Sequence, residues 1–202
     1  FGFKYQVKSL SYYGDISTLI FNATKLFHTV EGGAIIARDG QVAHKISYMR
    51  NFGHNKCEEF WGLGINGKNS EFHAAMGLCV LPHLNEIIKA RKQIFAWYDE
   101  QIADLPLSRP TLPEGTEYNY AYYPVVFPSE AKLLAAKEYL NKKDILPRRY
   151  FYPSLTRLPY IKSKDKPISE DISSRVLCLP VYTTLTIEDI HEVTSSIQAA
   201  LN

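Results

Sequence analysis

The chain has 202 residues, of which 46% are hydrophobic and 22% charged, a composition typical of a globular protein with a sizeable core rather than of a disordered or fibrous one. The formal net charge is only +2, from 23 Lys and Arg against 21 Asp and Glu, so no basic field is available to hold a nucleic acid backbone. Since no apolar run approaches about 20 residues, we expect no membrane span, and we expect no signal peptide either.

The three cysteines, Cys57, Cys79 and Cys178, are an odd number, lie far apart and form no CxxC pair. This pattern favours the reduced thiols of a cytoplasmic protein over a disulfide framework or a zinc site. We therefore expect a cytoplasmic location and no metal centre.

The first third of the chain reads as strands and turns followed by helices. Residues 17–22 (STLIFN) and 33–37 (GAIIA) are short β-rich runs, and the apolar spacing of residues 42–49 is helical. Ser70 is a good N-cap for a further helix, which Pro82 must break or kink because proline has no backbone donor. We place a domain boundary there, giving residues 1–81 and 82–202.

The second part has an α+β pattern. A long helical run after Pro82 connects the domains, and a final helix opens with capping-box character at Thr186 and Asp189. Such elements suit a small domain that packs helices on one face of a sheet. The other predicted elements are a strand at 120–127, a helix at 131–142, a loop at 147–159 and a strand at 176–179.

Lys25 stands between two apolar runs, with Gly32 and Gly33 just beyond it. Partial desolvation at the end of an apolar strand favours the neutral amine, a nucleophile that forms imines with aldehydes such as that of pyridoxal phosphate. Glycines lack side chains, so the backbone there can run close to a ligand. Taken alone, such a lysine more often simply extends to solvent.

Four ordered blocks surround this lysine. They are GDIST (14–18), FNATKLFHTVEGGAI (21–35), RNFG (50–53) and GLGINGKNSEFHAAMGL (62–78). The series resembles the sugar aminotransferases of the DegT/DnrJ/EryC1/StrS family, in the branch acting on nucleotide-linked 4-keto-6-deoxyhexoses. RRYFYPSL (148–155) and ISSRVLCLPVYTTLTIEDI (172–190) extend the resemblance more loosely to nearly the whole chain.

The resemblance implies an α/β chain with the pyridoxal phosphate-dependent transferase fold of type I. Residues 1–81 would be the C-terminal part of the cofactor-binding large domain, holding part of its mainly parallel sheet, and residues 82–202 the small α+β domain with its connecting helix. The implied activity moves an amino group from glutamate to a dTDP-linked or other nucleotide-linked keto-deoxysugar. Lipopolysaccharide or O-antigen biosynthesis in the cytoplasm, by a homodimer, is the expected setting.

The resemblance also assigns roles to residues. Lys25 is the catalytic residue that holds pyridoxal phosphate covalently and moves the proton between substrate and cofactor. Thr24 and Asn66 would join it in binding the cofactor, with Asn66 reaching across the dimer interface. The expected substrate-binding residues are His54, Arg149, Tyr150 and Tyr152.

Two departures from the family pattern keep alternatives open. Ile20 stands where the family usually has a serine that binds the cofactor phosphate, and a lost contact of this kind costs on the order of 1–3 kcal/mol unless Thr18 or Thr24 replaces it. The opening FGFKYQ resembles the segment that follows the family's aspartate block, and that aspartate protonates the pyridine ring. A truncated, non-catalytic relative is therefore an alternative. A dehydratase relative, which has histidine in place of the lysine, is disfavoured by Lys25.

Overall fold

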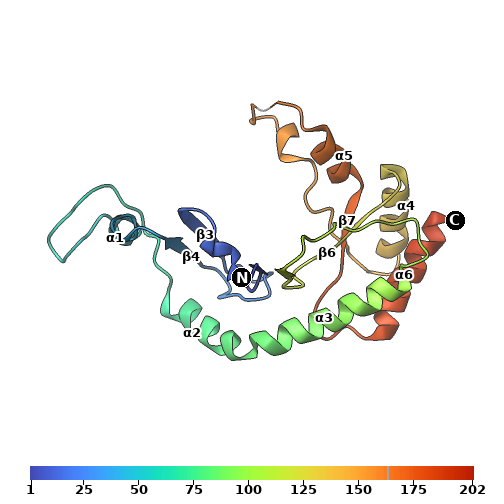
Figure 1. Ribbon diagram of the computed structural model, residues 1–202, viewed down its shortest axis with the longest axis horizontal. Coiled ribbons are helices and arrows are strands. Elements are labelled where there is room, and N and C mark those ends of the chain that lie inside the picture. The colour runs from blue at the N-terminus through green and yellow to red at the C-terminus, as the bar shows by residue number, and fades with distance from the viewer. Residues whose placement is uncertain (163) are drawn as a thin grey trace. The chain divides into compact units, whose positions relative to one another are not determined.

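The computed structural model describes residues 1–162 and 164–202, which divide into two compact units (Figure 1). Unit 1 comprises Phe1–Ile87 and Pro113–Asn119, and unit 2 comprises Ile88–Leu112 and Tyr120–Asn202. The division falls inside the long helix α3 (Leu84–Gln101), so this helix contributes to both units. The assignment of residues 1–81 to a cofactor-binding domain and of 82–202 to a small domain stays a prediction.

Unit 1 contains two small antiparallel sheets. The strands β1 (Lys4–Tyr5), β2 (Lys8–Ser9) and β5 (Thr116–Glu117) form one, in the order β2-β1-β5. The other is a hairpin of β3 (Ile16–Ile20) and β4 (Gly33–Ala37), whose last pair, Ile20 with Gly33, closes the segment that carries Lys25. A 3-10 turn, η1 (Leu10–Tyr12), leads from β2 toward β3.

The helices of unit 1 begin at side-chain caps. The Asp39 carboxylate accepts from the backbone N–H of Gln41 and Val42 at the start of α1 (Gly40–Met49). Ser70 caps α2 (Glu71–Val80), as predicted, by accepting from the N–H of His73. The predicted break at Pro82 is confirmed, since α2 gives way there to the 3-10 turn η2 (Leu81–His83).

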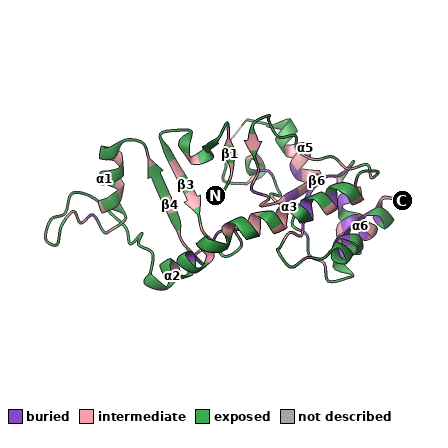
Figure 2. Ribbon diagram, turned by 60° about the horizontal axis from the view of Figure 1, so that its bottom comes forward, coloured by how far each residue is buried: buried purple, intermediate pink, exposed green. Residues whose placement is uncertain are grey.

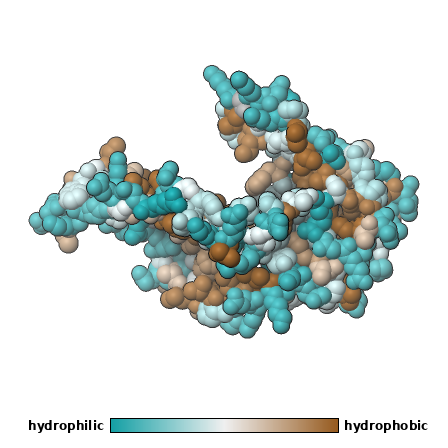
Figure 3. Space-filling model, viewed as in Figure 1, coloured by the Kyte–Doolittle hydropathy of each residue, from teal (hydrophilic) through white to brown (hydrophobic). Residues whose placement is uncertain are grey.

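Unit 1 buries little of its apolar surface. None of the ten residues of α1 is buried, and in α2 only Gly77 is (Figure 2). Figure 3 shows apolar atoms at the surface over α2, where Phe72 is 88% and Leu78 71% exposed. Ile20, at the end of β3, is 65% exposed. The core of this unit is therefore small and centres on the segment after Lys25, where Leu26, Phe27 and Thr29 are buried.

Unit 2 is built on the antiparallel pair β6 (Tyr123–Val126) and β7 (Val176–Leu179). Single bridges extend this sheet on both edges, from Ser108 to Val126 and from Arg148 to Cys178. Its helices are α4 (Glu130–Asn141), α5 (Pro167–Arg175) and α6 (Ile187–Leu201), with a 3-10 turn η3 (Leu155–Arg157). The predicted capping box of α6 is confirmed, because Thr186 and Asp189 cap each other's backbone.

Both faces of this sheet lie in the core of unit 2, since every residue of β7 and all of β6 except Pro124 are buried. Side chains two residues apart on a strand share a face, and Tyr123, Val125, Leu177 and Leu179 are all nearly fully buried. Helix α3 packs there, since the Tyr98 and Tyr123 rings lie 4.7 Å apart and the Tyr98 hydroxyl donates to the Pro180 carbonyl at 3.0 Å. Thr194 of α6 donates to Gln101 of α3 at 2.7 Å. Within the described residues, no helix is both long and apolar enough to span a membrane.

Candidate active site

Lys25 lies on a loop of residues 21–32, here called the lysine loop, between the two strands of the β3–β4 hairpin. The base of the loop is closed by backbone hydrogen bonds from Phe21 N–H to the Gly32 carbonyl and from Thr29 N–H to the Phe21 carbonyl, both 2.9 Å. At its tip, Lys25 N–H donates to the Asn22 carbonyl at 2.9 Å. The lysine is thus placed by a tight turn on a closed base, and its side chain is half-buried.

Asn22 organises the tip of the loop with its side chain. Its amide oxygen accepts from the Thr24 N–H at 3.1 Å and from the Thr24 hydroxyl at 3.0 Å, while its amide nitrogen donates to Glu31 at 2.7 Å. An asparagine that bonds the backbone two residues on is a recognised turn former. The Thr24 hydroxyl proton is therefore engaged within the loop, directly beside the lysine.

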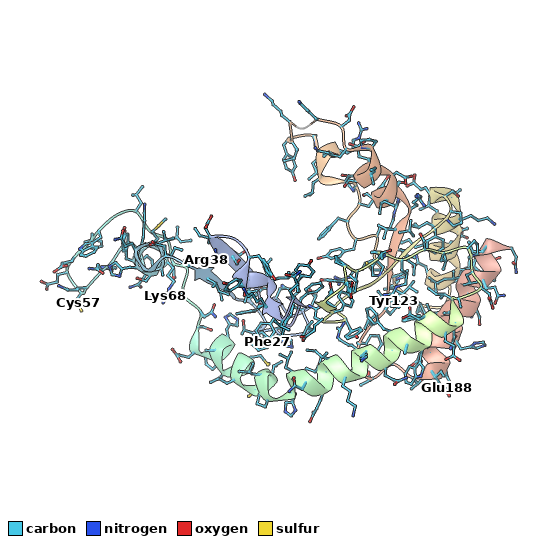
Figure 4. All side chains as sticks on the ribbon, viewed as in Figure 1. Phe27, Arg38, Cys57, Lys68, Tyr123 and Glu188 are labelled. Carbon is cyan, nitrogen blue, oxygen red and sulfur yellow. The ribbon has the colours of Figure 1, made fainter. Side chains whose placement is uncertain are left out.

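Apolar packing anchors the other side of the lysine. Phe27 is 7% exposed, stacks on the Phe1 ring at 4.6 Å and meets the Phe21 ring edge-on at 5.0 Å (Figure 4). Because the buried Leu26 and Phe27 follow Lys25 directly, the lysine Cα is held by packing rather than by the turn alone. Such support from outside the reacting group is what a catalytic side chain needs.

Helix α2 lies against this anchor at Gly77. A Cβ added to Gly77 would come 2.8 Å from the Thr29 methyl carbon and 3.7 Å from the Phe27 ring. Thr29 cannot easily turn aside, because it is 5% exposed and its hydroxyl donates to the Glu31 carbonyl at 2.7 Å. The absence of a side chain at Gly77 is thus what lets the helix approach the lysine loop.

Val30 carries backbone strain at the far end of the loop. Its φ is +66°, a region that β-branched residues rarely adopt because the side chain crowds the backbone. This conformation lowers stability by roughly 1–2 kcal/mol. Glycine would remove that cost, and its greater conformational entropy in the unfolded chain would lower stability by only about 0.5–1 kcal/mol. The strain is therefore stored five residues from the lysine.

Val30→Gly is accordingly expected to raise the free energy of unfolding by up to about 1 kcal/mol, measured by urea denaturation. The matched exchange Val42→Gly, inside α1, has no strain to relieve and should lower it by about 1 kcal/mol. If both substitutions lowered the free energy of unfolding equally, the strain inferred at Val30 would be contradicted.

A hollow of about 780 Å³ opens beside the glycine pair, between the hairpin, α1 and residues 65–69. Its volume is in the range of small-molecule sites. Arg50 and Lys68 bring positive charge to its lining and Glu31 negative charge. A Cβ at Gly32 would lie 3.1 Å from the Asn69 side chain, so the glycine keeps the loop and residue 69 close together. Lys25 is not among the lining residues, but Gly32 and Gly33 belong to both features.

The site has a suitable reaction partner for the aldehyde of pyridoxal phosphate. Lys25 offers a half-buried primary amine on a closed loop, and primary amines are the groups that condense with aldehydes. At the phosphate end, Ile20 is 65% exposed and offers no hydrogen bond, and the Thr24 hydroxyl donates to Asn22. Arg50 and Lys68, in the lining of the hollow, are cations of the kind that bind phosphate. The chain therefore fits pyridoxal phosphate at Lys25, which offers an amine for the aldehyde of the cofactor.

Asn66 and His54 lie on the segment between α1 and α2. Asn66 is exposed and forms a β-bridge with Asn51, and His54 bridges to Phe60, whose ring lies 4.2 Å from the imidazole. Figure 1 shows the segment reaching out beyond α1, and Cys57 marks its far end in Figure 4. Its apolar side chains are exposed: Phe60 (67%), Trp61 (54%), Leu63 (93%) and Ile65 (71%).

The other three predicted residues belong to unit 2. The Arg149 guanidinium donates to Glu130 at 2.6 Å and to the Ser174 carbonyl at 2.5 Å, and it lies 3.5 Å from the centre of the Tyr152 ring. The Tyr150 ring lies 5.1 Å from that of Tyr122. The structure thus brings Arg149 and Tyr152 into contact, and it places Thr24 beside Lys25. The roles of all seven predicted residues stay predictions.

Sequence reasoning missed three residues that shape these groups. Asn22 could have been found from the turn-forming pattern two residues before Thr24. Gly77, a glycine inside a helical pattern, is also a signal of close packing. Glu130 carried no signal, because its pairing with Arg149 joins residues 19 apart that only the tertiary fold brings together.

Comparison with known proteins decides the family. A profile of the DegT/DnrJ/EryC1/StrS aminotransferase family matches residues 1–198. The chain belongs to this family. Its members are pyridoxal phosphate-dependent enzymes, and the α/β transferase fold expected from the sequence is confirmed by solved structures. The expectation that residues 1–81 hold part of a mainly parallel sheet is wrong for the described residues, because each strand pair of unit 1 is antiparallel. The aminotransferase TlmJ from Streptoalloteichus hindustanus superposes with a TM-score of 0.91 at 24% identity, covering 98% of this chain and 55% of that protein.

Two relatives of the chain share one name. The dTDP-4-amino-4,6-dideoxy-D-glucose transaminase of Shigella dysenteriae is 32% identical over 98% of the chain and 56% of its own length. The Escherichia coli protein of that name is 35% identical over 81% of the chain and 47% of its own length. The structure of DesI, solved in the presence of its TDP-sugar product, has a TM-score of 0.85 at 30% identity, covering 94% of the chain and 50% of that protein. The chain thus spans about half the length of the relatives it matches.

Proposed function

We propose that the chain is a pyridoxal phosphate-dependent aminotransferase, or the C-terminal half of one, that moves an amino group to a dTDP-linked or related keto-deoxysugar. The observation that carries the proposal is Lys25, a half-buried amine held by the Asn22 turn and the Phe27 packing in a member of an aminotransferase family. Relatives named as dTDP-sugar transaminases favour this over a non-catalytic relative. Bound pyridoxal phosphate would supply an electron sink for the substrate carbon.

In this proposal the residues of unit 1 serve the cofactor. Lys25 would hold its aldehyde covalently, and its amine would serve to move the proton at the substrate carbon. Thr24 and Asn66 assist in holding the cofactor, and Asn66 does so for a neighbouring subunit. Asn22 and Phe27 keep the lysine in place through the hydrogen bonds and ring contacts described above.

On the substrate side, we assign His54, Tyr150 and Tyr152 to the sugar nucleotide and the amino donor, with Arg149 acting through its contact with the Tyr152 ring. Glutamate is the proposed donor. A homodimer is supported by the exposed apolar side chains of the segment between α1 and α2, such as Trp61 and Leu63. Synthesis of lipopolysaccharide or another surface polysaccharide in the cytoplasm is the proposed setting, consistent with the free thiols of Cys57, Cys79 and Cys178.

The test is covalent trapping. The purified 202-residue chain is mixed with pyridoxal phosphate, an absorbance band near the edge of the visible range is recorded, and borohydride is added to fix any imine. Peptide mass mapping is expected to find the pyridoxyl group on Lys25. A pyridoxyl group spread over several exposed lysines, without enrichment at Lys25, would contradict the proposal.

A further inference from the structure

Arg148 and Arg149 are neighbours in the chain but have opposite surroundings. The Arg149 side chain is 13% exposed and lies against α4, α5 and a tyrosine ring. Arg148 is exposed. Since both precede the aromatic run Tyr150-Phe151-Tyr152, the proposed substrate site has two candidate cations, and their environments differ enough to assign separate roles.

The guanidinium of Arg149 is engaged in hydrogen bonds within the protein. One nitrogen, Nη2, donates both to Glu130 Oε1 at 2.6 Å and to the Ser174 carbonyl at 2.5 Å. Nε is buried and has no hydrogen-bond partner among the described residues. A phosphate or carboxylate binds arginine best through two parallel N–H groups, and both such pairs on a guanidinium include Nη2. A ligand would therefore have to break the bond to Glu130 or the bond to Ser174 to bind Arg149 in this way.

These contacts join three parts of unit 2. Glu130 is the first residue of α4, Ser174 lies in the last turn of α5, and the guanidinium covers one face of the Tyr152 ring at 3.5 Å. The Ser173 hydroxyl adds a second link from α5 to this loop, donating to the Phe151 carbonyl at 2.6 Å. Tyr152 nevertheless remains 50% exposed, so part of the ring is open to a ligand.

Arg148 extends from the edge of the sheet. Its N–H donates to the Cys178 carbonyl at 3.1 Å, and Cys178 N–H donates back at 2.8 Å. Register places its side chain on the same face as Cys178 and Pro124. Cys178 is buried on that face, whereas Arg148, at the edge of the sheet, is exposed. Within residues 1–162 and 164–202, the Arg148 guanidinium has no hydrogen-bond or ion-pair partner. Burial raises the pKa of the Cys178 thiol to about 11, so that neighbour adds no charge at neutral pH.

We propose that Arg149 is a positioning residue, which fixes Tyr152 and the aromatic loop to α4 and α5, and that Arg148 is the cation that meets a phosphate or carboxylate of the ligand. The assignment of Arg148 rests on the proposed function, since the ligand is that of the aminotransferase. The positioning role of Arg149 rests on the contacts alone. Two experiments therefore test them separately.

The positioning role is tested by the ring resonances of Tyr152 in the full chain, with labelled tyrosine and Tyr152→Phe for assignment. Arg149→Met and Glu130→Gln are both expected to shift these resonances, and the double variant should be no less stable to urea than Arg149→Met alone. Arg157→Met is the matched control, because Arg157 pairs with Glu170 of α5 from the same loop. Unchanged Tyr152 resonances in Arg149→Met, or equal shifts in Arg157→Met, would overturn the role.

The role of Arg148 is tested by titrating the chain separately with dTDP and with glutamate, using calorimetry. Arg148→Gln is expected to weaken the binding of one of them at least about tenfold without moving the Tyr152 resonances, as the loss of a charge-assisted hydrogen bond predicts. Weakened dTDP binding assigns Arg148 to the diphosphate, and weakened glutamate binding assigns it to the donor carboxylate. If neither ligand binds the wild-type chain, or both bind Arg148→Gln unchanged, the assignment is overturned. Trapping at Lys25 reports on the proposed function independently.

Discussion

Lys25→Ala is expected to abolish the borohydride-fixed pyridoxyl group and the absorbance band that precedes it. Alanine has no amine to condense with the aldehyde, and no other lysine of the chain lies on the turn that Asn22 and Phe27 support. In any form of the protein that turns over, the proton transfer proposed for this amine would be worth about 10²–10⁴-fold in rate, so activity is expected to fall by at least that factor. Absorbance and peptide mapping measure the first effect, and a coupled assay the second.

Lys68→Ala is the control for this experiment. Lys68 lines the hollow beside the glycine pair, so it is the lysine best placed to give a misleading adduct. Its removal is expected to leave the Lys25 adduct intact, although it can weaken the binding of the phosphate. An adduct that survives Lys25→Ala but disappears in Lys68→Ala would show that the reactive amine is Lys68 and that the proposed catalytic role is wrong.

Gly77→Val is expected to destabilise the chain and to impair trapping at Lys25, through the packing of α2 on the lysine loop. Replacing a helix glycine normally helps the helix, by roughly 1 kcal/mol for alanine. Here the first added carbon would already lie 2.8 Å from the methyl group of Thr29, a buried side chain held by its hydrogen bond to Glu31. Overpacking of this kind costs about 1–3 kcal/mol, and because Thr29 belongs to the lysine loop, the added side chain strains that loop or separates it from α2. Urea denaturation and the yield of pyridoxyl-Lys25 are the two measurements.

Ala75→Val is the matched control on the same helix. Ala75 is exposed, so the added carbons meet solvent and only the helix propensity of valine counts, about 0.5 kcal/mol. Its stability and trapping yield should stay close to those of the wild-type chain. Gly77→Val would contradict the packing argument if it proved as stable and as reactive as Ala75→Val.

Local sequence rules were sufficient for features formed by residues close together in the chain. The Ser70 cap, the break at Pro82 and the capping box of Thr186 each depend on hydrogen bonds within a few residues, and each is confirmed. The strand before the lysine was placed at 17–22, whereas β3 spans Ile16–Ile20. The last two residues were misassigned because Phe21 and Asn22 use their backbone and side-chain groups to close the lysine loop.

The sequence by itself determined the reactive group and the family, because an amine at position 25, a glycine pair and ordered blocks are properties of residue identity and spacing. Only the tertiary structure decided how these groups are supported. The approach of Gly77 to Thr29, and the pairing of Arg149 with Glu130, join residues far apart in the chain. Two adjacent arginines look equivalent in a sequence, whereas in the structure one is exposed at the edge of the sheet and packing against two helices encloses the other.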